Sequence, residues 1–497
     1  MNGIGLEPGI LYSMRKTHNI SDFPSFLKYY FPMRATGEIF SSMFYKLSVS
    51  DTVIGEYQDD SVGKTCVPST DKVKGQDDFA SFNAFWFVDC NFVVDDAGVK
   101  IPTCIEGQSG FKRTGKVQVG VLTPPLYYGI EKTADGEIWH LSDTPHPGLV
   151  LMPHCKDNFG KPMPYGIVPK YYAGRIDGLL YGSSGLPVEN FLSYMSLHTE
   201  VQKLGAGYMG AGSERSAYLE TMLRIKYARS SSQAVFRGCT DYNFQYAAAK
   251  PSSGNYIVLT KAQASKFYVG STVSIGEAGA NTDIDRQKDY MRNLADKVKI
   301  TKIEDVDETY SRIYVDAPTF AATTTTYIST MPLHSGQTDV VLGNDGQLAN
   351  DGRHSFKLQG VEEGIGAYFI SANEVMNKET ATKTVFYARG SAPYSTDLES
   401  IRNSWKEIGS FESENSADAW IGEIDMDMET GAEVIRTIGS GSNSGTGDKY
   451  YFGSNDTGLR EMLKRGDLRS GSAGGLSFVN GWNRRGGAGW RCAGCIS

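Results

Sequence analysis

The sequence predicts an α+β protein built mainly from short strands, with its clearest helices in one stretch near the middle. Glycine, tyrosine and phenylalanine are frequent, at 56, 28 and 23 of the 497 residues, against 18 prolines. Aromatic and β-branched runs broken by turn residues recur along the chain, which is typical of strands. Residues 190–204 and the stretch beginning at Ser213 instead repeat apolar side chains every three or four positions, which predicts two helices.

The composition excludes several classes of protein. A net charge of −8 argues against binding driven by nucleic-acid phosphates. Glu7 and Pro8 interrupt the apolar run that a signal peptide needs, and no run approaches the ~18 apolar residues of a membrane helix. Seven cysteines, an odd number spread from Cys66 to Cys495, do not read as a disulfide framework. We therefore expect a soluble protein that is made in a cytoplasm, inserts into no membrane and binds no nucleic acid.

Taken in order, the chain divides into four predicted parts. Residues 1–78 form a small N-terminal attachment or assembly module, which ends in the polar stretch YQDDSVGKTCVPSTDKVKGQDD. Residues 79–250 contain strands followed by the two helices, the second of them capped by Ser213. Residues 251–332 carry strands of period two, including the hairpin KITKIE…RIYVDA, and form an inserted small β-barrel or β-sandwich. Residues 333–497 complete the domain that 79–250 begin.

The last part of the chain carries the candidate binding residues. A helix-like LREMLKRG at 459–466 leads into a glycine-rich stretch with large and polar side chains between the glycines. Its apolar residues, such as Leu476 and Val479, are too many for a flexible linker. Turns that present tryptophan, arginine, asparagine and serine are the chemistry of a binding surface. The predicted receptor-binding residues are Arg465, Asp467, Arg469, Ser470, Ser472, Ser477, Phe478, Asn480, Trp482, Asn483, Arg484, Arg485 and Trp490.

This terminal segment resembles the closing segment of C-type lectin-like domains in phage and prophage tail proteins that are diversified by retroelements. The fold of those domains is shared with formylglycine-generating enzymes. PKYYAG at 169–174 and VFRGCTDYN at 235–243 resemble the first half of the same domain. The residues of the terminal segment that match are Leu459, Arg460, Gly474, Gly475, Leu476, Asn480, Trp482, Asn483, Gly489, Trp490 and Arg491.

The resemblance implies a C-type lectin-like, formylglycine-generating-enzyme-type domain made of residues 79–250 and 333–497, with a variable-type ligand-binding segment at 459–497. It implies a receptor-binding protein of a phage tail tip or fibre, made in the bacterial host cytoplasm, that adheres to a bacterial cell-surface protein or glycan. It also implies a homo-oligomer, a trimer in related tail proteins, whose weak contacts add through avidity. The N-terminal module would attach to other virion tail proteins. No catalytic residue, cofactor or metal is expected.

Two further motifs favour ordinary structural roles. The stretch Gly205–Gly210 matches a dinucleotide fingerprint, but the residues before it predict a helix where that fingerprint needs a strand, so we interpret it as a turn between helices. Four carboxylates alternate with apolar residues at strand period and lack EF-hand spacing. A solvated strand face is the default for them, and a calcium site is the alternative. They are Glu423, Asp425, Asp427 and Glu429.

Two other functions stay open. A copper-dependent oxidase of the formylglycine-generating type would use Cys492 and Cys495, although their short spacing and terminal position depart from that enzyme pattern. A structural tail or baseplate protein without receptor contact would bury the terminal segment against a neighbouring subunit. Metal content of the purified protein tests the first alternative, and protection of the segment from proteolysis in the assembly tests the second.

Overall fold

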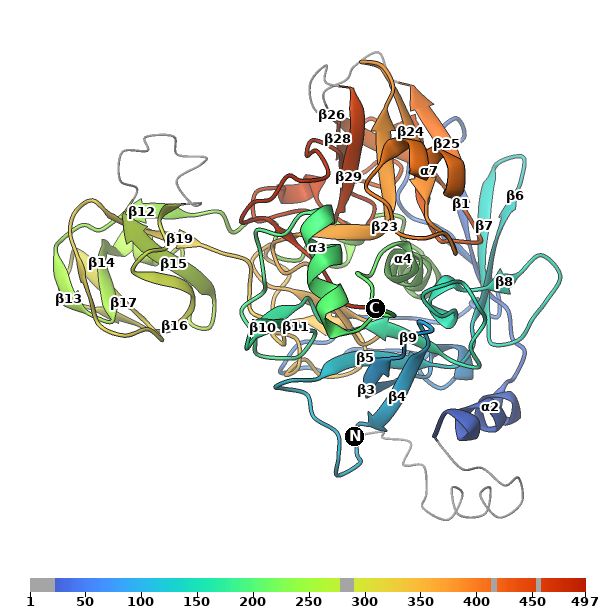
Figure 1. Ribbon diagram of the computed structural model, residues 1–497, viewed down its shortest axis with the longest axis horizontal. Coiled ribbons are helices and arrows are strands. Elements are labelled where there is room, and N and C mark those ends of the chain that lie inside the picture. The colour runs from blue at the N-terminus through green and yellow to red at the C-terminus, as the bar shows by residue number, and fades with distance from the viewer. Residues whose placement is uncertain (1–22, 278–289, 413–417, 453–456) are drawn as a thin grey trace.

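The computed structural model describes residues 23–277, 290–412, 418–452 and 457–497 (Figure 1). It has the mixed, strand-rich architecture that the sequence predicts. The beginning of the predicted N-terminal module, residues 1–22, lies outside the described part. Within the described ranges, no helix is long and apolar enough to cross a membrane.

The N-terminal residues share a sheet with the region that follows. Strand β1 pairs along its whole length with β7, so the predicted boundary at residue 78 does not coincide with a break in this sheet. Helix α2, Phe23–Arg34, precedes it and buries Phe26, Leu27, Tyr30 and Phe31. The five antiparallel strands, in the order β2-β1-β7-β6-β8, are β1 Phe40–Tyr45, β2 Glu56–Asp59, β6 Tyr127–Lys132, β7 Gly136–Ser142 and β8 Val150–Leu151.

A four-stranded antiparallel sheet lies next in the chain, in the order β4-β3-β5-β9. Its central strand β5 is buried at every residue, as its run of aliphatic side chains predicts. A short hairpin follows it, β10 Gly174–Ile176 with β11 Leu179–Tyr181. The sheet strands and the 3₁₀ turns around them are η1 Asn83–Phe85, β3 Val88–Val94, β4 Lys100–Ile105, β5 Gln118–Thr123, η2 Pro153–Cys155 and β9 Gly166–Pro169.

The two predicted helices are present. Helix α3, Tyr194–Val201, begins with a capping box between Ser193 and Ser196 and continues into the 3₁₀ turn η3, Gln202–Leu204. Helix α4 spans Ser213–Tyr227, and a 3₁₀ turn η4, Ser232–Ala234, follows it. The cap position of α4 is Gly212, so the prediction that Ser213 caps this helix is wrong: Ser213 is its first helical residue, and its hydroxyl donates to Thr430 O instead (2.6 Å).

The inserted region forms a lobe at one side of the molecule, on the left in Figure 1. Six strands form one sheet in the order β12-β19-β15-β16-β17-β14, and the first of them, β12, lies before the predicted start of the insertion at residue 251. A bridge between Lys250 and Val258 brings the two ends together, so the sheet is a nearly closed barrel. Ile257, Ile275 and Ile313 are among its buried core residues. The elements are β12 Gln245–Ala247, β13 Ser252–Gly254, β14 Tyr256–Thr260, α5 Lys261–Ala264, β15 Thr272–Glu277, β16 Ala295–Asp305, β17 Tyr310–Val315, β18 Phe320–Ala322 and β19 Thr326–Thr330.

The C-terminal part forms the largest sheet, in the order β25-β24-β23-β29-β30-β28-β26-β27, with β31 paired in parallel to β23. Residues 459–466, predicted to be helical, instead lie mainly in strand β29, because β23 and β30 pair with it on its two sides. The elements are β20 Gly346–Gln347, β21 Phe356–Leu358, β22 Val361–Glu363, β23 Tyr368–Lys378, β24 Lys383–Ala388, α7 Leu398–Ser404, β25 Lys406–Glu412, β26 Asp418–Met426, β27 Glu433–Ile438, β28 Lys449–Tyr451, β29 Gly458–Lys464, η5 Gly471–Ala473, β30 Val479–Asn480 and β31 Cys492–Ala493.

Helix α4 lies in the middle of these sheets, and all of its residues are buried. It packs against strands of the N-terminal and the C-terminal sheets. Arg224 pairs with Glu220 of the same helix, but two other cations of α4 are neutralised by carboxylates from distant parts of the chain. Arg215 pairs with Glu363, which also accepts from Arg465 Nε at 3.2 Å, and Lys226 Nζ lies 2.5 Å from Asp345 Oδ2.

Glu363→Ala should destabilise the protein by about 3–5 kcal/mol, because it leaves two buried guanidinium groups without their shared carboxylate. Urea unfolding followed by circular dichroism measures the change. Glu304→Ala is the matched control, since Glu304 forms its ion pair on the partly exposed surface of the barrel, and its midpoint should stay that of the unmodified protein. A Glu363→Ala midpoint equal to that of the control would contradict the role given to Glu363.

Candidate functional site

Residues 465–497, the part of the terminal segment that follows strand β29, are built into the sheets at several points. Strand β30 pairs with β29 and β28, and β31 pairs with β23. The last residue, Ser497, is 1 % exposed. Its backbone N–H donates to Met209 O at 2.8 Å, and its carbonyl accepts from Met209 N at 2.9 Å. The segment is therefore held at both ends of its path and has a defined conformation between them.

Six of the thirteen predicted binding residues are buried, contrary to the expectation that all of them are displayed. Arg465 illustrates the reason. Besides its ion pair with Glu363, it donates to Ser216 Oγ at 3.1 Å and to the carbonyl of Leu476, so it ties the segment to helix α4. The six buried residues are Arg465, Asp467, Ser477, Phe478, Asn480 and Trp490.

The buried polar residues among these six shape the backbone of the segment. Asp467 accepts from the backbone N–H of Arg469 at 2.9 Å and lies 3.6 Å from the guanidinium of Arg491. Asn480 Oδ1 accepts from the backbone N–H of Trp482 at 2.8 Å. Each buried oxygen thus holds a turn of the segment in place, as buried polar groups must find partners.

The two buried aromatic residues fill space between the segment and the sheet. Phe478 stacks on Tyr368 with ring centroids 5.7 Å apart and planes 6° from parallel. Trp490 is 3 % exposed, and the guanidinium groups of Arg469 and Arg491 each lie 5.9 Å from its ring centroid. Arginine over an indole face is a favourable contact. These rings therefore act as packing residues of the segment.

Residues 481–489 form a short loop, which we call the displayed loop, and all of it except Gly481 is exposed or partly exposed. Trp482 is 59 % exposed, Arg484 is exposed, and Asn483 and Arg485 are partly exposed. Three other predicted binding residues lie earlier in the segment: Arg469 and Ser472 are exposed and Ser470 is partly exposed. Tryptophan is enriched at protein interfaces, where its ring supplies contact area and its N–H a hydrogen bond.

The backbone of the displayed loop is fixed by contacts beneath it. Arg460 Nη1, from β29, donates to the carbonyl of Trp482 at 2.9 Å, and Gly487 N donates to Arg484 O at 2.6 Å. Met195, at the start of α3, donates its N–H to Arg485 O at 3.2 Å and is itself 40 % exposed. Arg460 and Met195 were not among the predicted binding residues, because only the fold brings β29 and α3 under the loop.

A buried glutamate lies below the same loop. Glu461, on β29, is 0 % exposed, and burial raises the pKa of its carboxyl to about 8, although hydrogen bonds from Tyr194 N (2.8 Å) and from Asn483 oppose that shift. Within the described ranges, its Oε1 has no hydrogen-bond partner. Sequence reasoning missed this residue since a glutamate in LREMLKRG is ordinary on the exposed face of a helix, and the strand conformation is what turns it inward.

The cysteine pair of the alternative oxidase is buried. Burial raises the pKa of the Cys495 thiol to about 12 and that of the Cys492 thiol still further from its usual range. Copper prefers thiolate ligands, so two protonated thiols fit it poorly without a base to accept their protons. Among the described residues, the one group with metal-ligand spacing is Cys66, Asp77 and Asp345, and there the ammonium of Lys226 already lies 2.9 and 2.5 Å from the two carboxylates.

The four alternating carboxylates each face a cation of the protein. Lys132 pairs with Asp425 at 2.9 Å, and Lys406 pairs with Asp427 and Glu429 at 2.6 and 3.2 Å. Arg436 contacts Glu423 at 3.3 Å. Ordinary ion pairs therefore account for this row. The glycine-rich stretch 205–210 follows η3 and precedes α4, so it is the turn between helices that we predicted.

No protein-family model and no curated protein sequence matches this chain.

Glu461→Gln should make stability less dependent on pH. The folded pKa of about 8 lies above the unfolded value of 4.5, so the folded protein holds a proton that the unfolded chain releases between these pH values. Glu461 therefore destabilises the fold progressively from about pH 4.5 to pH 8. Thermal melts should show a gain of less than about 1 kcal/mol for the variant at pH 5, and a larger gain, up to about 4 kcal/mol, at pH 8.

The control for this comparison is Glu407→Gln, which removes an exposed glutamate of β25 and should leave the pH profile unchanged. A Glu461→Gln variant that is no more stable at pH 8 than at pH 5, relative to the unmodified protein, would contradict the assignment of a buried, protonated carboxyl under the displayed loop.

Proposed function

We propose that this protein is a receptor-binding protein of a phage or prophage tail, which adheres to a bacterial cell-surface molecule through its displayed loop. The observation that carries the proposal is Trp482, an exposed tryptophan followed by three exposed or partly exposed polar residues, on a backbone that β29 and α3 hold in place. The loop offers an apolar ring beside Asn483, Arg484 and Arg485, which is a combination that a protein or glycan receptor could contact.

Energetics support binding by such a loop. Tryptophan and arginine carry much of the binding energy at protein interfaces, and tryptophan loses little conformational entropy because it has two rotatable side-chain bonds. A loop that is already ordered loses less freedom on binding than a flexible one. The contacts of Arg460 and Met195 with the loop backbone provide that order.

The proposal includes a C-type lectin-like fold of the formylglycine-generating-enzyme type, whose variable segment is residues 459–497. It is supported by the sequence resemblance and by the way the segment alternates between buried anchors and exposed positions. The loop itself is small, so an oligomer, such as the trimer of related tail proteins, would add weak contacts through avidity. The N-terminal residues would then attach the protein to other tail components. Binding of this kind requires no cofactor.

Trp482→Ala should abolish adhesion without unfolding the protein, while Trp490→Ala should destabilise it by about 3–5 kcal/mol, because Trp490 is buried and Trp482 is exposed. Cell-binding assays on candidate host bacteria and circular dichroism melts separate the two effects. Tyr290→Ala, an exposed aromatic residue of the inserted barrel, is the control and should keep both adhesion and stability.

Unchanged adhesion of a well-folded Trp482→Ala variant would contradict the proposal. Loss of the oligomer in that variant, measured by light scattering, would instead place the displayed loop in a subunit interface and favour the structural tail protein.

Diversification predicts a pattern in the gene. The 3′ ends from sibling isolates should differ at codons of exposed residues, such as Arg469, Ser472, Trp482 and Arg484, and a near-copy of the 3′ end should lie beside a reverse-transcriptase gene. Codons of buried anchors such as Phe478 should vary much less, because changes there cost packing energy. Sequencing the locus in many isolates measures both features. An invariant 3′ end without a repeat would contradict diversification and leave a fixed adhesin.

A further inference from the structure

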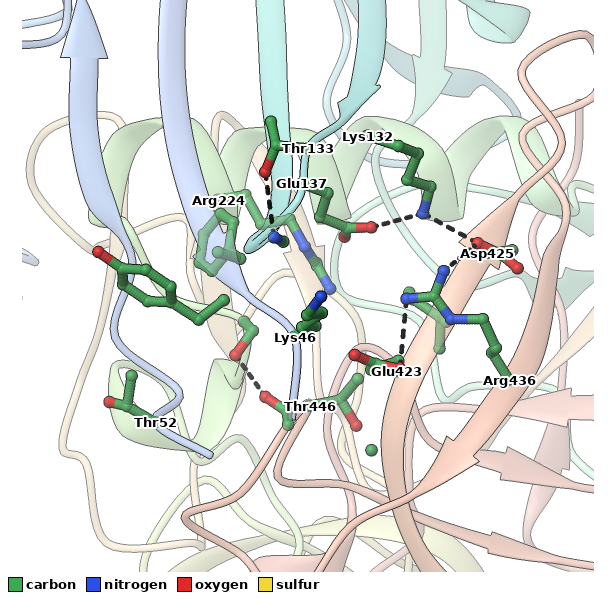
Figure 2. Close-up of a pocket in the computed structure, with 17 residues that line it drawn as sticks. Lys46, Thr52, Lys132, Thr133, Glu137, Arg224, Glu423, Asp425, Arg436 and Thr446 are labelled. Atoms are coloured by element: carbon green, nitrogen blue, oxygen red, sulfur yellow. Dashed lines mark hydrogen bonds and ion pairs between the residues drawn. The ribbon is translucent and has the colours of Figure 1, made fainter. Parts of the chain in front are cut away.

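A cavity of about 490 Å³ lies between the N-terminal sheet and the outer strands of the C-terminal sheet (Figure 2), and none of its lining residues belongs to the displayed loop. Strands β1, β6 and β7 form one wall and β26 and β27 the other. Helix α4 supplies the floor through Arg224. A volume of this size is within the usual range of small-molecule sites.

The floor of the cavity is buried and rigid. Arg224 is 2 % exposed, and its guanidinium lies 4.4 Å from the ring centroid of Trp139 and 5.7 Å from that of Phe44. Its Nη1 is bound to Glu220, one helical turn earlier in α4. Stacking on two aromatic rings and a buried carboxylate fix the guanidinium plane, so its other edge is available to the cavity in one orientation.

The rim of the cavity consists of ion pairs that alternate in charge. Lys132 Nζ lies 2.7 Å from Glu137 and 2.9 Å from Asp425, and Arg436 lies 3.0 Å from Asp425 and 3.3 Å from Glu423. Figure 2 shows these pairs as a continuous chain of contacts along one side. The side chains of Lys132 and Asp425 are 49 % and 47 % exposed, so the rim is open to solvent while the floor is not.

The charges around the cavity balance. Its walls carry four cations, Lys46, Lys132, Arg224 and Arg436, and three carboxylates, Glu137, Glu423 and Asp425. Glu220, behind Arg224, is the fourth carboxylate. A charged ligand would therefore gain little from the net charge of this site and would have to compete with existing ion pairs.

A neutral ligand with several hydroxyl groups suits this arrangement better. Each hydroxyl can donate to a carboxylate and accept from a neighbouring lysine or arginine, and hydrogen bonds to charged groups are the stronger kind. Because the ion pairs already hold their side chains, such a ligand would add hydrogen bonds without ordering new side chains. The hydroxyl of Thr446, on the cavity wall, is taken by the carbonyl of Ile421 at 3.0 Å, so the charged groups are the main partners on offer.

We infer that this cavity binds a neutral sugar, one hexose unit of a glycan, and that it is a second binding site distinct from the displayed loop. Arg224 at the floor and Asp425 at the rim are the groups placed to hydrogen-bond its hydroxyls from two sides. The inference rests on the cavity and does not depend on the proposed function of the terminal segment.

The test uses the full-length protein and free sugars. Saturation-transfer-difference NMR with D-glucose, D-galactose and D-mannose should detect binding of at least one of them. Titration should then show that D-glucuronate and D-glucosamine, which carry a charge, bind more weakly than the neutral sugar. Asp425→Asn should weaken binding of that sugar by roughly tenfold or more, because it removes an ionised acceptor and loosens two cations at once.

The matched control is Glu429→Gln, which removes a 69 % exposed carboxylate from the same alternating row but outside this cavity, and it should leave sugar binding unchanged. Trp482→Ala should also leave it unchanged, so that failure of this inference and failure of the adhesion proposal can be told apart. Absence of binding for all three neutral hexoses, preference for a charged sugar, or equal binding by a folded Asp425→Asn variant would each overturn the inference.

Discussion

The fold depends on ion pairs that neutralise the charged side chains of one fully buried helix. Helix α4 carries Arg215, Glu220, Arg224 and Lys226 into the interior, and a buried charge without a partner costs several kcal/mol. Arg224 and Glu220 pair with each other within the helix, whereas the partners of Arg215 and Lys226 come from far along the chain, Glu363 on β22 and Asp345 just before β20. Helix α4 can therefore be buried only when the N-terminal and C-terminal sheets have closed around it. We regard this shared burial of charge as the constraint that gives the sheets their relative position.

The same constraint reaches the terminal segment. Arg465 shares Glu363 with Arg215, and Ser477 Oγ donates to Glu220 Oε1 at 2.8 Å. Residues that look in sequence like part of a polar display surface are thus members of the buried charge network of α4. This explains why only some positions of the terminal segment are exposed. The residues that belong to the charge network are buried and fix the backbone, and loops such as 481–489 remain at the surface with a defined conformation. An ordered loop is what a binding surface of so few residues needs.

Sequence reasoning reached the local features and missed the long-range ones. The two central helices follow from apolar spacing, and the barrel strands of the inserted region follow from period-two alternation. Residues 459–466 have helical composition, yet two neighbouring strands make them a strand, and no local pattern reveals those neighbours. Likewise, nothing in the spacing of Arg465 or Asp467 distinguishes a buried arginine or aspartate from an exposed one. The cavity was also beyond prediction, because residues from 44 to 446 form it.

One buried carboxylate contacts both the floor of the cavity and the terminal segment. Glu220 binds Arg224, the floor of the cavity, through Oε2, and it accepts from Ser477 of the terminal segment through Oε1. Burial raises the pKa of Glu220, whereas the charge of Arg224 and the hydroxyl of Ser477 lower it, so its ionisation depends on both contacts. A ligand that engages the free edge of Arg224 must act on the same guanidinium that Glu220 neutralises. The floor of the cavity and the terminal segment therefore share one buried carboxylate of α4 as a hydrogen-bond partner.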